Sequence, residues 1–221
     1  MVLIHRDPPI YLLSEEIRFP DPSKAGEDGL VALSADLSPD RIRAAYARGI
    51  FPWFRHQGYT YWYSPDPRMI LYPERLHISS SLGRRIRSGR FSVCVDRDFL
   101  GVMRACAEVP RRGAEGSWID EVFMSAYGAL FEAGEAHSVE VYEGDLLVGG
   151  LYGVVSGRFF CGESMFAKRP DASKVALAAL CGEWMGRWGL EIIDCQVPSD
   201  HLGRMGGQTI SRAEFLRLLH A

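Results

Sequence analysis

The chain has 221 residues, of which 47% are apolar and 24% charged, a composition that suits a soluble globular protein of one large or two modest domains. No apolar stretch reaches the ~20 residues that a helix needs to cross a bilayer, and early charges and prolines argue against a signal peptide. The five cysteines form no Cys-x-x-Cys pair, which favours reduced thiols in the cytoplasm over disulfides or a zinc site.

The net charge of −3 conceals a basic segment. Residues 41–112 hold 14 of the 25 Lys and Arg residues but only 5 of the 28 Asp and Glu residues. A charge distribution of this kind can attract a polyanion to one face of a protein. Charge alone leaves two interpretations open, a solvated surface or a nucleic-acid interface.

The first 67 residues predict a small N-terminal α/β domain. Abundant Pro, Asp and Gly in the first forty residues predict loops and short strands. A capping hydroxyl at Ser38, followed by Pro and Asp, predicts a helix that runs to Arg48 and ends at Gly49. Two prolines in residues 63–67 exclude a helix interior and a central strand. We therefore divide the chain into residues 1–67 and 68–221.

The second part predicts an α+β domain with a mostly antiparallel sheet flanked by helices. Predicted strands cover residues 91–95, 138–142, 146–155, 158–161 and 191–195, and predicted helices cover residues 96–109, 119–134, 172–188 and a last helix opened by a capping box at 211–214. Tight turns make three of these strands an antiparallel meander. Acetyltransferase-like (GNAT) domains have this order of elements, a meander followed by a helix and another strand. The analogy concerns the fold and does not identify a reaction.

Several common catalytic and cofactor-binding motifs are missing from the sequence. It has no Walker A loop and no Gly-x-Ser-x-Gly elbow, and its six histidines have no metal-ligand spacing. The loop that holds coenzyme A pyrophosphate in acetyltransferases is also absent, and residues 204–209 match it only in part. We therefore expect no metal and no cofactor.

Polar residues next to apolar strands are the remaining candidates for chemistry. Glu163 follows one predicted strand, and Asp194 and Gln196 end another. Each can be a satisfied structural group, but three of them at strand ends of one sheet make a shared site plausible. The aromatic residues within 51–63 are either core or a platform for unstacked nucleotides.

Taken in order, short motifs in the chain closely resemble the leucyl/phenylalanyl-tRNA–protein transferase family, over roughly residues 28 to 219. The motifs lie at residues 49–54 (GIFPWF), 62–68 (WYSPDPR), 117–119 (SWI), 136–140 (AHSVE), 148–153 (VGGLYG), 162–166 (GESMF), 172–174 (ASK) and 193–196 (IDCQ). The resemblance implies transfer of leucine or phenylalanine from aminoacyl-tRNA to proteins that begin with Lys or Arg, which marks them for Clp-dependent degradation.

The resemblance also implies residue roles. Trp53 and Trp118 would hold the terminal adenosine of the tRNA. The other expected substrate-binding residues are Tyr46, Tyr127 and the apolar pocket residues Leu151, Met165, Leu180 and Ile193. Leu180 stands where an aromatic residue is expected, which bears on the preference between leucine and phenylalanine. The acids Asp194 and Glu163, with Gln196, would handle the attacking amine, and the expected tRNA-binding residues are Arg84, Arg85, Arg87 and Arg90.

Strand alternation adds one geometric expectation, that Asp194 and Gln196 share a face while Cys195 points away. Two other functions stay open as alternatives. One is a GNAT-type acyl-CoA N-acyltransferase, which would bind coenzyme A. The other is an RNA-binding module without turnover, which would bind tRNA whether or not it is aminoacylated.

Overall fold

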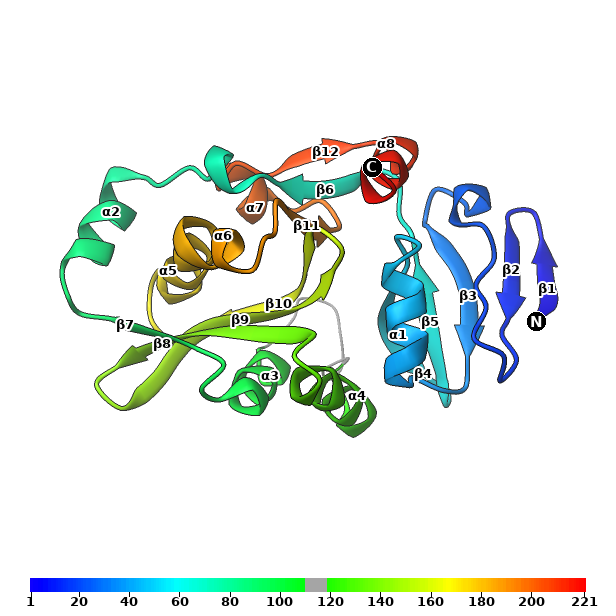
Figure 1. The fold of residues 1–221 in the computed structure, drawn as a ribbon, viewed down its shortest axis with the longest axis horizontal. Coiled ribbons are helices and arrows are strands. Elements are labelled where there is room, and N and C mark those ends of the chain that lie inside the picture. Colours follow the sequence, from blue (N-terminus) through cyan, green and yellow to red (C-terminus); the bar gives the residue numbers. More distant parts are fainter. Residues whose placement is uncertain (110–118) are drawn as a thin grey trace.

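The computed structural model of the protein describes residues 1–109 and 119–221. The molecule is elongated, with a five-stranded sheet at one end and a seven-stranded sheet in the larger remainder (Figure 1). The first sheet has the order β1-β2-β3-β5-β4, with β1 (Val2–Arg6), β2 (Pro9–Leu12), β3 (Leu30–Ser34), β4 (Phe51–His56) and β5 (Tyr59–Tyr63). A short helix, η1 (Pro22–Lys24), connects β2 to β3. Within the described ranges, no helix is long and apolar enough to cross a membrane.

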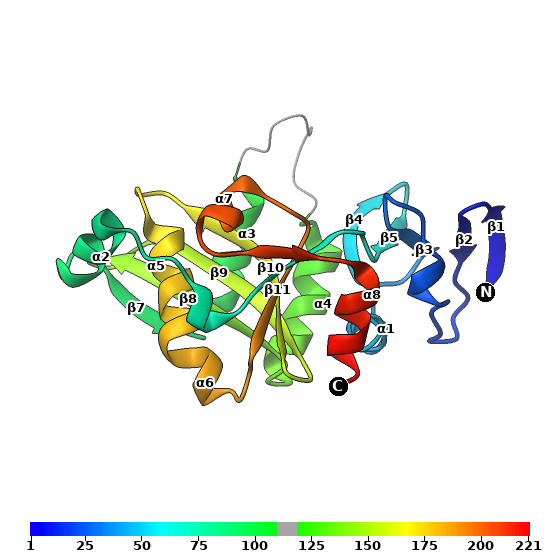
Figure 2. The same cartoon turned by 90° about the horizontal axis from the view of Figure 1, so that it is seen from above.

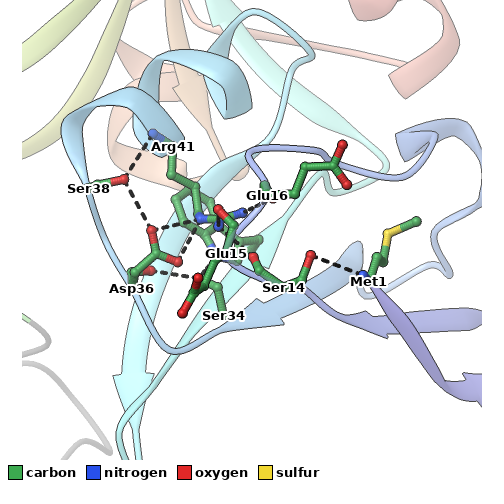
Figure 3. Close-up of polar contacts among 9 residues, drawn as sticks. Met1, Ser14, Glu15, Glu16, Ser34, Asp36, Ser38 and Arg41 are labelled. Atoms are coloured by element: carbon green, nitrogen blue, oxygen red, sulfur yellow. Dashed lines mark hydrogen bonds and ion pairs between the residues drawn. The ribbon is translucent and has the colours of Figure 1, made fainter.

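Helix α1 (Pro39–Tyr46) lies on the side of this sheet that faces the rest of the molecule (Figure 1). As predicted, Ser38 caps it and accepts a hydrogen bond from the backbone N–H of Arg41. The buried Arg41 guanidinium donates to the Asp36 carboxylate and to the backbone carbonyls of Ser14 and Glu15 (Figure 3). A buried charge requires such partners. The network fixes the start of α1 to the loop after β2.

The second sheet has the order β12-β6-β11-β10-β9-β8-β7, and β10–β11 is the parallel pair among its described strands. The strands are β6 (Arg68–Leu71), β7 (Ser92–Val95), β8 (Ala136–Glu143), β9 (Leu146–Ser156), β10 (Phe159–Ala167), β11 (Ile192–Gln196) and β12 (Gln208–Ile210). Strands β8, β9 and β10 form an antiparallel meander, which helices α5 and α6 then connect to β11. The predicted α+β, acetyltransferase-like order of elements is confirmed.

Helices cover both faces of the second sheet (Figures 1 and 2). Helices α3 (Phe99–Ala107) and α4 (Glu121–Glu132) pack on one face, and α5 (Ala172–Ala179), η3 (Leu180–Trp184) and α6 (Met185–Arg187) follow each other on the opposite face. Gly149 of β9 permits the close approach of α5, and Gly150 of β9 permits close pairing with β8. A Cβ on Gly149 would lie 2.4 Å from the Cβ of Ala172 in α5, and one on Gly150 would lie 2.8 Å from the backbone carbonyl of Val139.

The remaining helices are η2 (Pro73–Arg75), α2 (Ser80–Arg87), α7 (Asp200–Arg204) and α8 (Arg212–Leu219). Helix α2 lies at the end of the molecule opposite the N-terminus (Figures 1 and 2). The expected cap of α8 is confirmed, because the Ser211 side chain accepts a hydrogen bond from the N–H of Glu214.

Of three local predictions near the sheet, two were wrong and one was confirmed. Helix α3 is capped by Asp98, whose carboxylate accepts from Gly101 N–H, while Asp96 has φ +56° and binds β8 instead. The predicted helical segment 172–188 is confirmed, because α5, η3 and α6 follow one another without a gap from Ala172 to Arg187, with η3 as a π-helical turn. Strand β10 continues to Ala167, so Glu163 lies within a strand rather than after it. In both wrong predictions, hydrogen bonding to a neighbouring strand overrides the local pattern.

The strands of the first sheet all lie before residue 64, and those of the second all lie after residue 67. This change of sheet supports the proposed division after Pro67. The hydrophobic core does not follow that division, because one buried cluster runs from Trp62 in β5 to Phe99 and Phe215 in the second part. We therefore propose two structural units that share a continuous core.

Candidate active site

A cavity of about 380 Å³ opens between β4 of the first sheet and the β9–β11 region of the second. Its lining residues are Phe51, Pro52, Trp53, Leu151, Tyr152, Phe160, Gly162, Glu163, Ser164, Met165, Leu180, Ile193, Cys195, Gln196, Val197, Ser199 and Leu202. The walls are therefore mainly apolar, with a few polar groups at one place. A cavity of this kind binds an apolar group and orients it through the polar residues.

Five of the eight expected substrate-binding residues line this cavity: Trp53, Leu151, Met165, Leu180 and Ile193. Leu180 reaches the cavity wall from the π-helical turn η3. Such a turn adds one residue to a helix and redirects the side chains around it. Trp53 packs edge-on against Tyr63, with ring centroids 4.8 Å apart, and forms the wall nearest the first sheet.

Irregular pairing in two adjacent strands shapes the polar part of the cavity. The register of β10 shifts between Gly162 and Ser164, and the register of β11 shifts between Asp194 and Gln196. Gln196 has φ +64°, a left-handed conformation that non-glycine residues rarely adopt. Strained backbone of this type concentrates at functional sites, where surrounding contacts hold it in place.

Glu163 is the centre of the polar cluster. Its carboxylate accepts hydrogen bonds from the hydroxyls of Tyr46 and Tyr127 and from the side-chain amide of Gln196. The Tyr127 and Gln196 bonds measure 2.9 and 3.0 Å, and the two hydroxyls lie 3.0 Å from each other. Four residues from α1, α4, β10 and β11 thus meet at one carboxylate.

Burial raises the pKa of Glu163 from its ordinary 4.5 to about 7, although hydrogen bonds from Tyr46 and Tyr127 favour the ionised form. The nearby Asp194 carboxylate adds to the rise, and the Gln196 amide opposes it. Burial also raises the pKa values of both tyrosines well above 10, so they remain hydrogen-bond donors at neutral pH. Glu163 can therefore exchange a proton near pH 7.

Asp194 is held by a different partner. Its carboxylate forms two parallel bonds with Arg68, at 2.8 Å to Nε and 2.5 Å to Nη2, and both side chains are 1% exposed. The guanidinium carbon lies 4.8 Å from the ring centroid of Phe51 and 4.4 Å from that of Phe215. The same Asp194 oxygen that binds Arg68 Nε accepts the backbone N–H of Gln196 at 2.9 Å. Asp194 therefore fixes the left-handed turn at Gln196 from behind the cavity.

The expectation that Asp194 and Gln196 share a face was wrong. Ile193 and Cys195 line the cavity, whereas the Asp194 carboxylate is directed to Arg68. Gln196 reaches the cavity because the register shift and its positive φ interrupt alternation. Burial raises the pKa of the Cys195 thiol, so this cavity residue stays protonated and unreactive.

The other expected residues lie in three different settings. Tyr46 and Tyr127 are buried behind Glu163 and do not line the cavity. Trp118 lies outside the described residues. On α2, Arg84 and Arg87 are exposed, whereas Arg85 lies 3.9 Å from Asp171. Arg90 follows α2 and is paired with Glu143 at 2.6 Å.

Sequence reasoning missed Arg68 and Cys195. Arg68 ends the motif at residues 62–68, but nothing in the sequence shows which carboxylate it meets 126 positions later. Cys195 had a usable signal, because a residue two positions from the pocket residue Ile193 shares its face in a regular strand. No cluster of three His, Cys, Asp or Glu residues suited to a metal occurs in the described parts of the chain.

The sequence of this chain is similar to those of known proteins over most of its length. Residues 70–220 match the sequence model described as leucyl/phenylalanyl-tRNA protein transferase, and residues 35–66 match the model of its N-terminal domain. A leucyl/phenylalanyl-tRNA–protein transferase of Anaeromyxobacter sp. (strain Fw109-5) is 53% identical over 210 residues, which cover 95% of this chain and 89% of the relative. That of Myxococcus xanthus (strain DK1622) is 49% identical, with 96% and 91% covered.

Among solved structures, the chain has a remote likeness to a GCN5-related N-acetyltransferase from Kribbella flavida. The two share 9% identity with a TM-score of 0.45, over 81% of this chain and 64% of the other. A structure of L-PGS from Bacillus licheniformis shares 13% identity with a TM-score of 0.42, over 78% and 56%. The acetyltransferase-like order of strands described above stands on the topology of this chain itself.

Proposed function

The chain belongs to the leucyl/phenylalanyl-tRNA–protein transferase family, and from this premise we propose that it transfers leucine or phenylalanine from aminoacyl-tRNA to the N-terminal amine of a protein. The observation that carries the proposal is the cavity, whose walls are mainly apolar and whose lining includes Glu163, a carboxylate with a pKa of about 7. An ester-linked amino acid is already activated, so the reaction needs a site that binds and orients rather than an energy source.

The apolar walls select the transferred side chain. Met165, Leu180 and Ile193 offer dispersion contacts to leucine or phenylalanine and no partner for a charge. Burying an uncompensated charge costs several kcal/mol, so acidic and basic amino acids are rejected. Trp53, at the edge of the cavity, offers an aromatic face for the terminal adenosine, as stacking on aromatic side chains is the usual mode for unpaired bases.

Glu163 is the proposed proton acceptor. The neutral amine of the acceptor attacks the ester carbonyl carbon, and a C–N bond forms. The amine proton passes to the Glu163 carboxylate, the C–O bond to the ribose breaks, and the protonated Glu163 returns this proton to the leaving ribose oxygen. A pKa of about 7 matches this role, because a useful fraction of the carboxylate is ionised where an N-terminal amine is partly neutral.

Gln196 and Asp194 act in two different ways in this scheme. The Gln196 amide lies in the cavity, bound to Glu163, and orients the incoming amine. Asp194 is a positioning residue, because its contacts are to Arg68 and to the backbone of Gln196. Tyr46 and Tyr127 likewise act through Glu163 by holding its carboxylate in one orientation.

The proposed acceptors are proteins that begin with Lys or Arg, and the proposed outcome is Clp-dependent degradation in the cytoplasm. The exposed arginines of α2 are the proposed contacts to the tRNA body, since phosphate contacts are made by Arg and Lys at surfaces.

One assay tests the function directly. The protein is incubated with Leu-tRNA labelled in leucine and with matched peptides beginning with Arg or Ala. Label in the Arg peptide alone is expected. Label in neither peptide would contradict the transferase activity, and equal labelling of both would contradict the acceptor preference. Acyl transfer from an acyl-CoA in the same assay would favour the alternative N-acyltransferase function.

A further inference from the structure

A second cavity, also of about 380 Å³, lies among α2, α5 and α7. Its lining residues are His77, Ser79, Leu82, Lys174, His201, Arg204 and Met205. They come from three segments far apart in the sequence, and a backbone bond of 2.9 Å from His77 N–H to the carbonyl of Met205 holds two of the segments together. The basic groups therefore meet through the fold and not through a run of charge in the sequence.

The charge of this cavity has one sign. Two permanently cationic side chains, Lys174 and Arg204, line it together with His77 and His201, and no carboxylate is among its described lining residues. Behind the lining, the Asp171 carboxylate accepts a hydrogen bond from Lys174 Nζ at 2.9 Å. The charge of Asp171 does not balance the two cations Lys174 and Arg204, so the cavity keeps an excess of positive charge. A concave surface with such a charge concentrates anions.

The pKa of His201 shows that the cavity disfavours an additional positive charge. Burial lowers the pKa of His201 below 6.5, and the charges of Lys174 and Arg204 lower it further. At neutral pH His201 is therefore an uncharged ring that can donate one hydrogen bond beside two cations. A group with several acceptor oxygens and a negative charge fits this set of donors.

Helix α7 places this cavity next to the candidate active site. Ser199 and Leu202 line the active-site cavity, and His201 and Arg204 of the same segment line the basic one. On its other side the basic cavity reaches the first turn of α2, through Ser79 and Leu82. It therefore lies between the place proposed for the aminoacyl end and the helix proposed for the tRNA body.

We propose that the cavity formed by His77, Lys174, His201 and Arg204 binds a backbone phosphodiester of the single-stranded acceptor end of the tRNA. This proposal rests on the proposed function and assigns a second anchoring point to the same substrate. The contact directs the strand from α2 across α7 into the active-site cavity. It makes reaction depend on the phosphates of the acceptor end as well as on the amino acid and its adenosine.

The test compares two substrates that differ in phosphates. One is the leucyl ester of adenosine, which has no phosphodiester, and the other is the leucyl ester of a tetranucleotide ending in CCA. The ratio of their kcat/KM values measures what the added nucleotides contribute. In Arg204→Gln the ratio should fall about ten-fold, as expected when a charged hydrogen bond is removed. Arg204→Lys, which keeps the charge, should recover part of this ratio.

A matched control and a salt series complete the experiment. Arg217→Gln removes an exposed cation from α8, far from this cavity, and should keep the wild-type ratio. The dependence of log KM on log salt for the tetranucleotide should become shallower by about 0.7 in Arg204→Gln, the value for one phosphate contact on a single strand. Thermal melting confirms that the exposed substitutions leave the fold intact.

The outcomes separate this proposal from the function on which it rests. If the wild type uses neither substrate, the transferase function fails. If it uses both and Arg204→Gln keeps the wild-type ratio and salt dependence, the phosphodiester site is refuted while the function stands. A fall in the ratio that Arg217→Gln shares equally would also refute it, because the effect would then come from overall charge.

Discussion

Arg68 and Asp194 are joined by two parallel hydrogen bonds in the interior of the molecule, with both side chains 1% exposed. The pair lies behind the candidate active site, and one Asp194 oxygen also binds the backbone N–H of Gln196. The geometry therefore makes the conformation of a cavity residue depend on a buried ion pair. This dependence can be measured.

Asp194→Asn should lower kcat for leucyl transfer by about two orders of magnitude, the loss expected when a change outside the reacting centre misplaces a group within it. It should also destabilise the fold by about 3–5 kcal/mol, because it leaves the Arg68 charge buried without a partner. Activity is measured in the peptide-labelling assay and stability by denaturant unfolding.

The double variant Arg68→Gln, Asp194→Asn distinguishes positioning from direct catalysis. A neutral pair of amides removes the uncompensated charge and keeps an acceptor for the Gln196 N–H. If Asp194 only positions Gln196, the double variant should regain at least part of the kcat that Asp194→Asn loses. A double variant as inactive as Asp194→Asn, despite restored stability, would mean that the carboxylate itself takes part in the reaction.

Glu163 should impose a pH dependence near neutrality. Because its ionised form accepts the proton, kcat/KM should rise with pH through about 7, in addition to the rise that the acceptor amine causes near pH 8. Glu163→Gln should lower the rate and remove this step, leaving only the titration of the acceptor amine. Glu191→Gln, at an exposed surface ion pair with Arg158, is the matched control. A Glu163→Gln profile that keeps the step near pH 7 would exclude Glu163 as its source.

The same raised pKa affects stability with a defined sign. Between pH 4.5 and 7 the folded protein retains a proton on Glu163 that the unfolded chain loses. The free energy of unfolding should therefore fall as pH rises through this window, and Glu163→Gln should flatten the fall. Urea unfolding at a series of pH values measures the slope.

The apolar cavity should select by shape and by charge. Met165→Glu should abolish leucine transfer while the fold survives, because this partly buried side chain lines the cavity and its replacement would place a charge against the substrate. Leu180→Phe should reduce cavity volume and disfavour phenylalanine relative to leucine, by about ten-fold or more in the ratio of kcat/KM values. Equal transfer of glutamate and leucine by the wild type would contradict selection by this cavity.

The arginines around α2 should differ in their contribution to tRNA binding. Arg84 and Arg87 are exposed, whereas Arg90 is already paired with Glu143. Replacing the first two with Gln should weaken Leu-tRNA binding. The slope of log K against log salt should also become shallower, by up to about 0.9 for each phosphate that is no longer neutralised. Arg90→Gln should have a smaller effect. Filter binding over a series of salt concentrations gives both quantities, and equal effects at all three positions would mean that overall charge matters more than place.

The sequence predicted the elements and the apolar wall of the site better than its polar part. The order of strands and helices follows from hydrophobic periodicity and from caps such as Ser38 and Ser211, which are local signals. Leu151, Met165 and Ile193 were expected to lie together, and they line one cavity. That expectation came from the family resemblance, and the pairing of β10 with β9 and β11 brings the three residues together.

The polar part depends on interactions that no local pattern reveals. The register shift between Asp194 and Gln196 changes which side chains reach the cavity, and it is stabilised by Arg68 from another strand. The placing of Tyr46 and Tyr127 behind Glu163 depends in the same way on how α1 and α4 pack against the sheet. The proposed role of Trp118 stays a prediction.

The environment of Arg68 also determines when the site can form as the chain folds. Its guanidinium contacts Phe51, Asp194 and Phe215, and the Asp194 contact spans 126 positions of sequence. Contacts between distant segments form late, because the entropy of loop closure must be overcome first. The left-handed turn at Gln196 depends on this contact, so we expect it to form late in folding. A partly folded chain would then lack an ordered site, and we expect catalytic competence only after these distant segments have met.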